Sequence, residues 1–386
     1  MIPRQLTDHI RKVAQQMPVL SITGPRQSGK TTLCRALFPD YLYANLEHPE
    51  TRAFALEDPR GFLAQRQGGM VIDEAQYAPD LFSYVQAMVD ETGRNGEFVL
   101  SGSQNFLFME RISQSLVGRV AIFHLLPFGL QELRETPFLP ERPFQFVLQG
   151  GYPRLYDQRV ALDVFFPAYV QTYVERDLRQ LINVSDLQQF QLFVRLCAGR
   201  IGQLFNQSAL ASEIGISQPT VKRWLSLLET SFVAFTLPPY YRNFNKRLTK
   251  TPKLYFFDTG LACYLLGIRD EAELMTHYAR GALFENFVVV ELMKQAYHQG
   301  KRPHAYFWRD KTGKEIDLIL DEGSSMYPFE IKSGQTLQPH FFDHLRYFQS
   351  LAGVAAEHST LIYAGDQNQQ RSYARVMSWD QIERPA

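Results

Sequence analysis

Residues 24–31, with the sequence GPRQSGKT, constrain the fold of this chain more than any other stretch. An apolar run, LSIT at residues 20–23, leads into this glycine-framed loop, and LCRALF at residues 33–38 follows it with the pattern of a helix. Glycines in such a loop let backbone N–H groups close around an anion where a side chain would be in the way. The order strand, loop and helix therefore predicts a phosphate-binding loop at the amino end of a helix.

The spacing of this loop matches the pattern G-x-x-x-x-G-K-S/T at every fixed position, which is the P-loop signature. We expect Lys30 to reach the outer phosphates of ATP and the hydroxyl of Thr31 to bind Mg²⁺. The expected ATP-binding residues are Gly24, Pro25, Arg26, Gln27, Ser28, Gly29, Lys30, Thr31 and Thr32.

An acidic pair follows a second apolar strand, in the sequence GGMVIDEAQ at residues 68–76. The strand run ends in Asp73 and Glu74, and the carboxyl ends of core strands are where an α/β sheet meets its ligand. We expect Asp73 to hold Mg²⁺, directly or through water, and Glu74 to orient and polarise the attacking water. The alternative for this stretch is an acidic turn that only terminates the strand.

Two further stretches offer candidates for completing an ATP site. FVLSGSQN at residues 98–105 predicts another core strand, after which Ser103 or Gln104 could contact the γ-phosphate or the lytic water. Arg119 precedes the apolar run AIFHLLPF and could neutralise transition-state charge, in its own chain or in a neighbouring subunit. The alternatives are an ordinary polar turn for the first stretch and a surface arginine for the second.

Five stretches together resemble a large prokaryotic family of AAA-type ATPases that carry a C-terminal domain of unknown function. These stretches are GPRQSGKTTL, VIDEAQ, LSGSQ, SLVGR and LPFGLQEL. QGGYPRL at residues 149–155 and YVERDL at residues 173–178 resemble further landmarks of that family. The resemblance runs through most of the chain. It implies a P-loop ATPase core with Mg²⁺ and supplies no agreed substrate.

The length of 386 residues exceeds what one hydrophobic core usually organises, so several domains are expected. The predicted fold class is α/β: a P-loop NTPase with a parallel sheet, then a winged-helix segment and a nuclease-like α/β domain. The predicted regions are an ATPase core at 1–140, a helical lid or linker at 141–200, a winged-helix segment at 201–270 and a nuclease-like domain at 271–386.

The balance of charges excludes recruitment of nucleic acid by a global field, because 40 basic and 40 acidic residues give a net charge of zero. Any contact with nucleic acid must therefore come from a local patch. No stretch approaches the roughly 18 apolar residues of a membrane span, and the first ten residues lack the apolar core of a signal peptide. The three cysteines are scattered in apolar surroundings, which is typical of core residues in a reducing compartment. Together with the missing membrane span and signal peptide, this pattern leads us to expect a cytoplasmic protein without membrane contact.

Residues 207–230, QSALASEIGISQPTVKRWLSLLET, have the layout of a helix-turn-helix. The first helix ends at Gly215, and Ser217 can cap a second helix that tolerates Pro219 in its first turn. Residues 231–258 predict two strands joined by a wing-like basic linker, and Lys253 is expected to belong to this linker. The candidate DNA contacts are Lys222, Arg223, Arg242, Lys246, Arg247 and Lys250. The alternative is a module used for domain packing or for contacts with a protein partner.

The C-terminal region places acids inside apolar elements. Glu285 lies in a predicted helix at 282–300, Asp317 in a strand at 314–323, and Glu330 and Lys332 in a strand at 326–334. An acid in an apolar strand is costly unless it is paired or binds a cation, and residues two apart on a strand face the same side. The four side chains are therefore predicted to converge, with a second Mg²⁺ or Mn²⁺ as their expected ligand.

This pattern resembles the core of the PD-(D/E)xK nuclease superfamily, although Ile316 replaces the proline that precedes the first acid of the pattern. The alternative is a salt bridge on the face of a strand. The whole chain is thus interpreted as a Mg²⁺-dependent ATPase that grips DNA and could cut it under the control of ATP. One competing hypothesis is a nucleotide-controlled scaffold for a protein partner, and another is a motor that remodels DNA without cutting. A homo-oligomer is compatible with each hypothesis.

Overall fold

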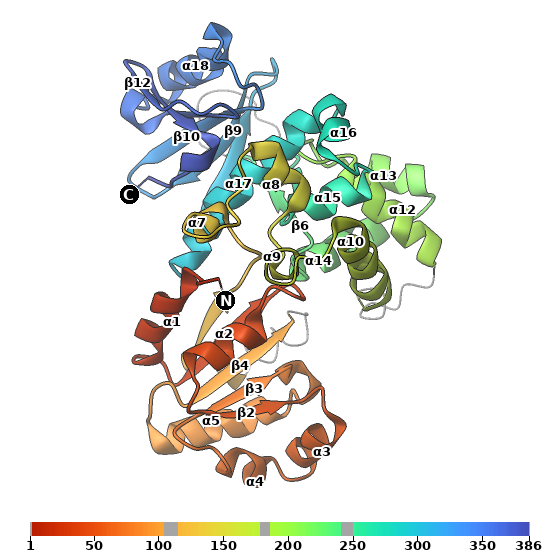
Figure 1. Ribbon diagram of the computed structural model, residues 1–386, viewed down its shortest axis with the longest axis vertical. Coiled ribbons are helices and arrows are strands. Elements are labelled where there is room, and N and C mark those ends of the chain that lie inside the picture. Colours follow the sequence, from red (N-terminus) through yellow and green to blue (C-terminus); the bar gives the residue numbers. More distant parts are fainter. Residues whose placement is uncertain (1, 104–114, 178–185, 241–249, 386) are drawn as a thin grey trace.

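The computed structural model describes residues 2–103, 115–177, 186–240 and 250–385. Within these ranges the chain forms an N-terminal α/β part, a helical middle part and a C-terminal α/β part (Figure 1). In the same ranges, no helix combines the length and the apolar character that crossing a membrane requires. Cys34, Cys197 and Cys263 are buried and carry free thiols, as their apolar surroundings predict.

The N-terminal part is built on a parallel sheet whose central strands are buried on both faces, which confirms the predicted α/β class for this region. In spatial order the strands are β2 (Leu42–Asn45), β3 (Met70–Asp73), β4 (Phe98–Ser103), β1 (Val19–Gly24) and β5 (Val120–His124). The covering helices are α1 (Leu6–Ala14), α2 (Lys30–Leu37), α3 (Pro49–Glu57), α4 (Pro59–Ala64) and α5 (Leu81–Thr92).

The two faces of this sheet support separate hydrophobic cores. Ile10 of α1 and Leu33 of α2 pack in one core, and Phe62 of α4 and Val85 of α5 pack in the other. Because all the strands run in the same direction, the ends of β1 and β3 lie at the same edge of the sheet. This order brings the glycine-rich loop and the acid pair to one edge.

The middle part is mainly helical. Gly215, with φ of +78°, ends the first helix of the helix-turn-helix, and the Ser217 hydroxyl accepts a 3.2 Å hydrogen bond from the Thr220 N–H at the start of the second. These two helices lie where the sequence predicts them, and the winged-helix assignment stays a prediction.

The helices of the middle part are α7 (Leu130–Leu133), α8 (Pro143–Gln149), α9 (Pro153–Asp157), α10 (Leu162–Tyr169), a π-helix (Val170–Asp177), α12 (Leu187–Ala198), α13 (Gln207–Ile214), α14 (Gln218–Thr230), α15 (Thr259–Leu265) and α16 (Glu271–Thr276). Strands β6 (Ala234–Leu237) and β7 (Lys253–Phe256) pair antiparallel.

The C-terminal part is a mixed sheet between two helices. Its strands, in spatial order, are β12 (Gln369–Arg371), β13 (Ala374–Ser378), β11 (Thr360–Tyr363), β10 (Met326–Lys332), β9 (Glu315–Asp321) and β8 (Ala305–Arg309). Helix α17 (Arg280–His298) packs Phe287 against one face, and helix α18 (Asp343–Ala352) packs Leu345 against the other.

Helix α17 connects the C-terminal sheet with the N-terminal part. It contacts β10 in the former, and α1 and β5 in the latter. Figure 1 shows this helix extending from the C-terminal sheet toward α1 and the N-terminus. One continuous hydrophobic core contains Ile2 and residues between Leu126 and Ile382, including much of α17, so this helix is packed along most of its length.

Candidate functional site

The loop between β1 and α2 has the backbone that a phosphate cradle requires. Gly24 has φ of +152°, and a Cβ there would lie 2.2 Å from the Leu125 carbonyl oxygen. Gly29 has φ of +93°, and Gln27, at +63°, is also left-handed. Only glycine fits the first of these positions without displacing backbone, so the local sequence dictates the shape of the loop.

The side chain of Lys30 lies inside this loop and is 7% exposed. Its Nζ donates to the carbonyl oxygens of Gly24 at 3.1 Å and Pro25 at 2.7 Å. Burial lowers the pKa of Lys30 to about 8, while the carboxylates of Glu74 and Asp73 act in the opposite direction. A cation is therefore held within the cradle, close to the acid pair at the end of β3.

Asp73, at the end of β3, accepts hydrogen bonds from two hydroxyl groups. Its Oδ2 accepts a 2.6 Å hydrogen bond from Thr31 and another of 2.6 Å from Tyr43. The sequence analysis missed Tyr43, whose pKa is raised by burial and by its bond to Asp73. Hydroxyl and carboxylate oxygens side by side are the ligand types that Mg²⁺ prefers, so Thr31 and Asp73 fit the ion predicted for them.

Glu74 follows Asp73 in a left-handed backbone conformation, with φ of +54°. Such a conformation costs a non-glycine residue energy and is concentrated at functional sites. Its carboxylate accepts a hydrogen bond from the side-chain amide of Gln76, which fixes its direction. Strand β4 ends at Ser103, and Gln104, the other sensor candidate, lies outside the described residues.

The rest of the predicted loop lies around the same cradle. Ser28 is fully buried, and Thr32 occupies the first turn of α2. The guanidinium of Arg26 lies 5.9 Å from the centre of the Tyr173 ring, within the range of a cation–π contact. The loop therefore contacts the helical middle part through Arg26.

The position of Arg119 corrects one prediction. Its guanidinium forms a two-pronged ion pair with Asp90, at 2.5 and 2.9 Å. Val120 pairs with Val19, the first residue of β1, whereas the phosphate loop follows the last residue of that strand. Arg119 thus lies at the opposite edge of the sheet and does not reach the ATP site within its own chain. A role in the site of a neighbouring subunit stays a prediction.

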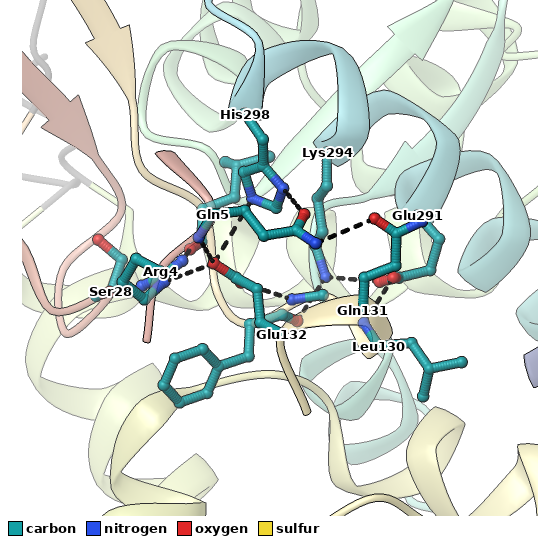
Figure 2. A network of polar contacts seen from close by, with 12 residues as sticks. Arg4, Gln5, Ser28, Leu130, Gln131, Glu132, Glu291, Lys294 and His298 are labelled. Atoms are coloured by element: carbon teal, nitrogen blue, oxygen red, sulfur yellow. Dashed lines mark hydrogen bonds and ion pairs between the residues drawn. The ribbon is translucent and has the colours of Figure 1, made fainter. Parts of the chain in front are cut away.

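Arg4 is a further residue that the sequence analysis missed (Figure 2). Its guanidinium donates to the carbonyl oxygen of Ser28 at 2.8 Å, to that of Leu126 at 2.6 Å and to Glu132 Oε1 at 2.8 Å. Burial opposes ionisation of Glu132, but Arg4 outweighs burial and lowers the pKa of this carboxyl to about 2. The buried ion pair with Glu132 therefore fixes the guanidinium that donates a hydrogen bond to the phosphate loop.

In the C-terminal part, the four predicted residues converge. Lys332 Nζ lies 2.6 Å from Glu330 Oε1, and Asp317 Oδ2 accepts a 2.7 Å hydrogen bond from the N–H of Ile331. Burial raises the pKa of Glu285 to about 7 and raises that of Glu330, and the charge of Asp317 adds to both shifts. We call Glu285, Asp317, Glu330 and Lys332 the acid cluster.

Lys253 enters this cluster from β7, which corrects its place in the predicted exposed linker. It is 2% exposed, its Nζ lies 2.9 Å from Glu285 Oε1, and it also forms an ion pair with Glu315. The Tyr255 hydroxyl donates to the same oxygen of Glu285. Lys253 therefore balances two partly buried carboxylates and is not available to contact DNA.

The second metal ion is not supported. The described ranges contain no group of three or more His, Cys, Asp or Glu side chains arranged to hold a metal. Each of the three carboxylates already has a partner at one of its oxygens: Lys253 for Glu285, a backbone N–H for Asp317 and Lys332 for Glu330. The predicted Mg²⁺ or Mn²⁺ at the acid cluster is therefore not supported, and the ammonium group of Lys253 lies beside Glu285.

The candidate DNA contacts are described only in part. Lys222 and Arg223 are exposed on α14, whose buried side carries Val221, Trp224 and Leu225. Lys250 is also exposed. Arg242, Lys246 and Arg247 lie outside the described residues.

Three family models match successive parts of the chain: an AAA domain at residues 16–134, a domain of unknown function (DUF8612) at 141–272 and another (DUF4143) at 280–382. An uncharacterized protein of Mycobacterium tuberculosis is 31% identical over 369 residues, covering 94% of this chain and 80% of the relative. The chain belongs to the same family as this mycobacterial protein. An uncharacterized family member from Mycobacterium bovis matches with the same values. An uncharacterized protein of Haemophilus influenzae is 23% identical over 359 residues, covering 84% of each chain.

Similarity to solved structures is weak. AMPPCP-bound DnaA from Aquifex aeolicus gives a TM-score of 0.31 at 12% identity, covering 57% of this chain and 86% of that chain. A STAND protein with a tetratricopeptide repeat sensor from Pyrococcus horikoshii gives 0.24 at 10% identity, covering 75% and 44%. Similarity at this level carries no argument about function. The AAA match and the geometry of the loop together make the N-terminal part an AAA-type ATP-binding domain.

Proposed function

We propose that the protein is a Mg²⁺-dependent ATPase whose ATP turnover controls how its C-terminal half grips DNA. The observation that carries the ATPase proposal is the meeting of Lys30, Thr31 and Asp73 at one edge of the sheet. Lys30 and Thr31 begin the helix that follows β1, and Asp73 ends β3. Their types match the needs of a triphosphate and its cation: an ammonium, a hydroxyl and a carboxylate.

Each group has a specific task in this proposal. The loop N–H groups bind phosphate oxygens, and Lys30 exchanges the carbonyl oxygens of Gly24 and Pro25 for them. Since the pKa of Lys30 is about 8, the side chain is mostly charged at neutral pH. Thr31 and Asp73 would hold Mg²⁺, which when bound neutralises phosphate charge. Glu74, oriented by Gln76, takes a proton from the attacking water.

The DNA proposal rests on the exposed basic pair Lys222 and Arg223, at the start of a helix that follows a helix-turn-helix bend. Phosphate contacts of this kind give binding that weakens as salt rises. We propose that the protein binds DNA without cutting it, because Lys253 pairs with Glu285, one of the acids that a nuclease would need for its metal.

The test measures ATP hydrolysis by the full chain with single-stranded, duplex and branched DNA, and scores strand breaks in parallel. We expect DNA to stimulate hydrolysis at low salt without breaks. The double variant Lys222→Glu with Arg223→Glu should lose this stimulation. A matched pair of exposed basic residues, Arg11 and Lys12, provides the control when both are changed to Glu. Hydrolysis that DNA leaves unchanged, with no DNA retention at low salt, contradicts the DNA proposal.

A second candidate function is a nucleotide-controlled scaffold for a protein partner. The observation that favours it is the neutralised acid cluster, in which Glu285 is paired with Lys253 and Tyr255. This candidate predicts slow ATP turnover that does not respond to DNA. The assay above therefore distinguishes the two candidates.

A further inference from the structure

Residues 126–132, which follow β5 and enter α7, contact both the phosphate loop and helix α17. We call them the hub segment. From one side Arg4 binds its Leu126 carbonyl oxygen and its Glu132 carboxylate. From the other side α17 binds the backbone at Phe128 and Leu130. Figure 2 shows these contacts meeting around Glu132 and Lys294.

Arg4 fixes the direction of one peptide group in the phosphate loop. It donates to the carbonyl oxygen of Ser28, and in a planar trans peptide the next N–H, that of Gly29, points the opposite way. A Cβ at Gly29 would lie 3.7 Å from Nη1 of Arg4, so the guanidinium lies beside Gly29. Arg4 therefore holds the Gly29 N–H, which belongs to one of the residues expected to bind phosphate, on the side away from its own guanidinium.

Two buried charges of α17 hold the hub segment from the other side. Glu291 Oε2 accepts a 2.6 Å hydrogen bond from the N–H of Leu130. Lys294 Nζ donates to the Phe128 carbonyl oxygen at 2.8 Å and to Glu291 Oε1 at 2.9 Å. The two side chains are 3% and 4% exposed, so any shift of the hub segment would remove the hydrogen bonds that its backbone makes with these buried charges.

A second link runs through Gln5 and His298. The Gln5 N–H donates to Glu132 Oε1 at 3.0 Å, and its side-chain oxygen lies 2.7 Å from His298 Nδ1. Burial lowers the pKa of His298 to about 4, so the ring is neutral at neutral pH. With an amide oxygen as its partner, Nδ1 carries the proton and donates it. The last residue of α17 is thus tied to the residue next to Arg4.

Helix α17 also carries Glu285 of the acid cluster. Glu285 and Glu291 are separated by six residues, which corresponds to about 9 Å along a helix. A packed helix moves as a unit. A displacement of the hub segment therefore reaches the acid cluster without any change in secondary structure.

We propose that Arg4 is a positioning residue of the ATP site and that it couples the phosphate loop to helix α17, so that the nucleotide state and the state of the acid cluster influence each other. The proposal rests on the proposed ATP binding. Thermodynamic linkage makes the influence reciprocal: whatever shifts α17 also changes the affinity for ATP.

The first part of the test measures MgATP affinity of the full chain by calorimetry. Arg4→Lys keeps a cation beside Glu132 but cannot make three directed hydrogen bonds from one planar group. We expect MgATP affinity to fall about tenfold or more, the change that loss of one hydrogen bond to a charged group causes. Arg11→Lys, at an exposed arginine of α1, is the matched control and should bind as the unchanged protein does.

The second part follows hydrogen exchange of the β10 amides with and without saturating MgATP. In the unchanged protein we expect MgATP to alter exchange in β10. In Arg4→Lys this response should be lost even when nucleotide is saturating, which a merely destabilising change would not cause. Gln5→Ala, at an exposed residue, is a milder variant that folds if Arg4→Lys does not. It should keep MgATP affinity within about twofold and reduce the β10 response.

The outcomes separate this proposal from the function on which it rests. If the unchanged protein has no affinity for MgATP, the proposed function fails and the coupling fails with it. If MgATP binds but β10 does not respond, or if Arg4→Lys and Gln5→Ala bind and respond as the unchanged protein does, the coupling is overturned and the ATP site stands.

Discussion

The hydroxyl of Thr31 donates a 2.6 Å hydrogen bond to the carboxylate of Asp73. Thr31 lies in the first turn of α2, which follows β1, and Asp73 ends β3; strand β4 lies between β1 and β3 in the sheet. Because parallel strands align their carboxyl ends, this order brings a hydroxyl and a carboxylate together at the mouth of the phosphate loop. The ATP site is thus a product of sheet topology as well as of local sequence.

Glu74→Gln should retain affinity for MgATP and lose hydrolysis by about 10²- to 10⁴-fold, because an amide cannot accept the proton of the attacking water. Single-turnover hydrolysis and calorimetry on the same preparation measure the two quantities. Glu91→Gln, at an exposed acid of α5, is the matched control. Normal turnover by Glu74→Gln would remove the role of general base from this residue.

Arg119→Ala should bind MgATP normally and hydrolyse it slowly, provided that the arginine serves the site of a neighbouring subunit. Its place at the far edge of the sheet excludes action within the chain. Mixing Arg119→Ala with Lys30→Ala should then restore hydrolysis, because the second variant supplies an intact Arg119 to the intact site of the first. Full activity of Arg119→Ala alone would show that the arginine only pairs with Asp90.

The sequence predicts the phosphate loop and the acid pair well, because each motif is contiguous and its chemistry is local. It misses Arg4, Tyr43 and Glu132, whose roles depend on partners far away in the chain. The position of Arg119 could have been deduced: a residue that precedes a strand of a parallel sheet lies at the edge opposite the loops that follow the strands.

Lys253 illustrates a different limit. In the sequence it stands near other basic residues, which favours an exposed role. In the structure, strand β7 pairs with β6 and turns this side chain toward Glu285 and Glu315. A strand of four residues is too short for the alternation of apolar and polar side chains to show which of its sides is buried. The acids of the cluster, by contrast, lie in strongly apolar elements and are predicted to converge.

Lys253→Met should lower the free energy of unfolding by about 3–5 kcal/mol, since it leaves buried carboxylates without their cation. Chemical denaturation at neutral pH measures the change. Lys250→Met, at an exposed lysine three residues earlier, is the matched control and should change stability little. Adding Glu285→Gln to Lys253→Met should recover part of the loss. Unchanged stability of Lys253→Met would contradict the internal ion pair.

Acidification should destabilise the protein in part through His298. The folded-state pKa of about 4 lies below the ordinary value of 6.5, so the unfolded chain binds the extra proton between these values. Stability is therefore present above about pH 6.5 and is lost as the pH falls toward 4, by an amount on the order of 3 kcal/mol for this ring. His124, with a pKa also lowered to about 4 by burial, contributes in the same direction.

The measurement compares denaturant unfolding of the unchanged protein and His298→Gln at pH 7.5 and pH 5. The variant should lose less stability between the two pH values. Glu285, with a raised pKa, acts in the opposite direction, but both proteins contain it and its effect cancels in the comparison. Equal losses in the two proteins would show that His298 does not titrate as its burial requires.

The central claim is that a triphosphate binds where the loop amides, Lys30, Thr31 and Asp73 meet. Calorimetric titration of the full chain with MgATP tests it most directly, with Lys30→Ala beside the unchanged protein. We predict saturable binding by the unchanged protein and loss of at least tenfold in affinity for Lys30→Ala. No heat of binding from the folded, unchanged protein, or equal affinity of the two proteins, would contradict the account.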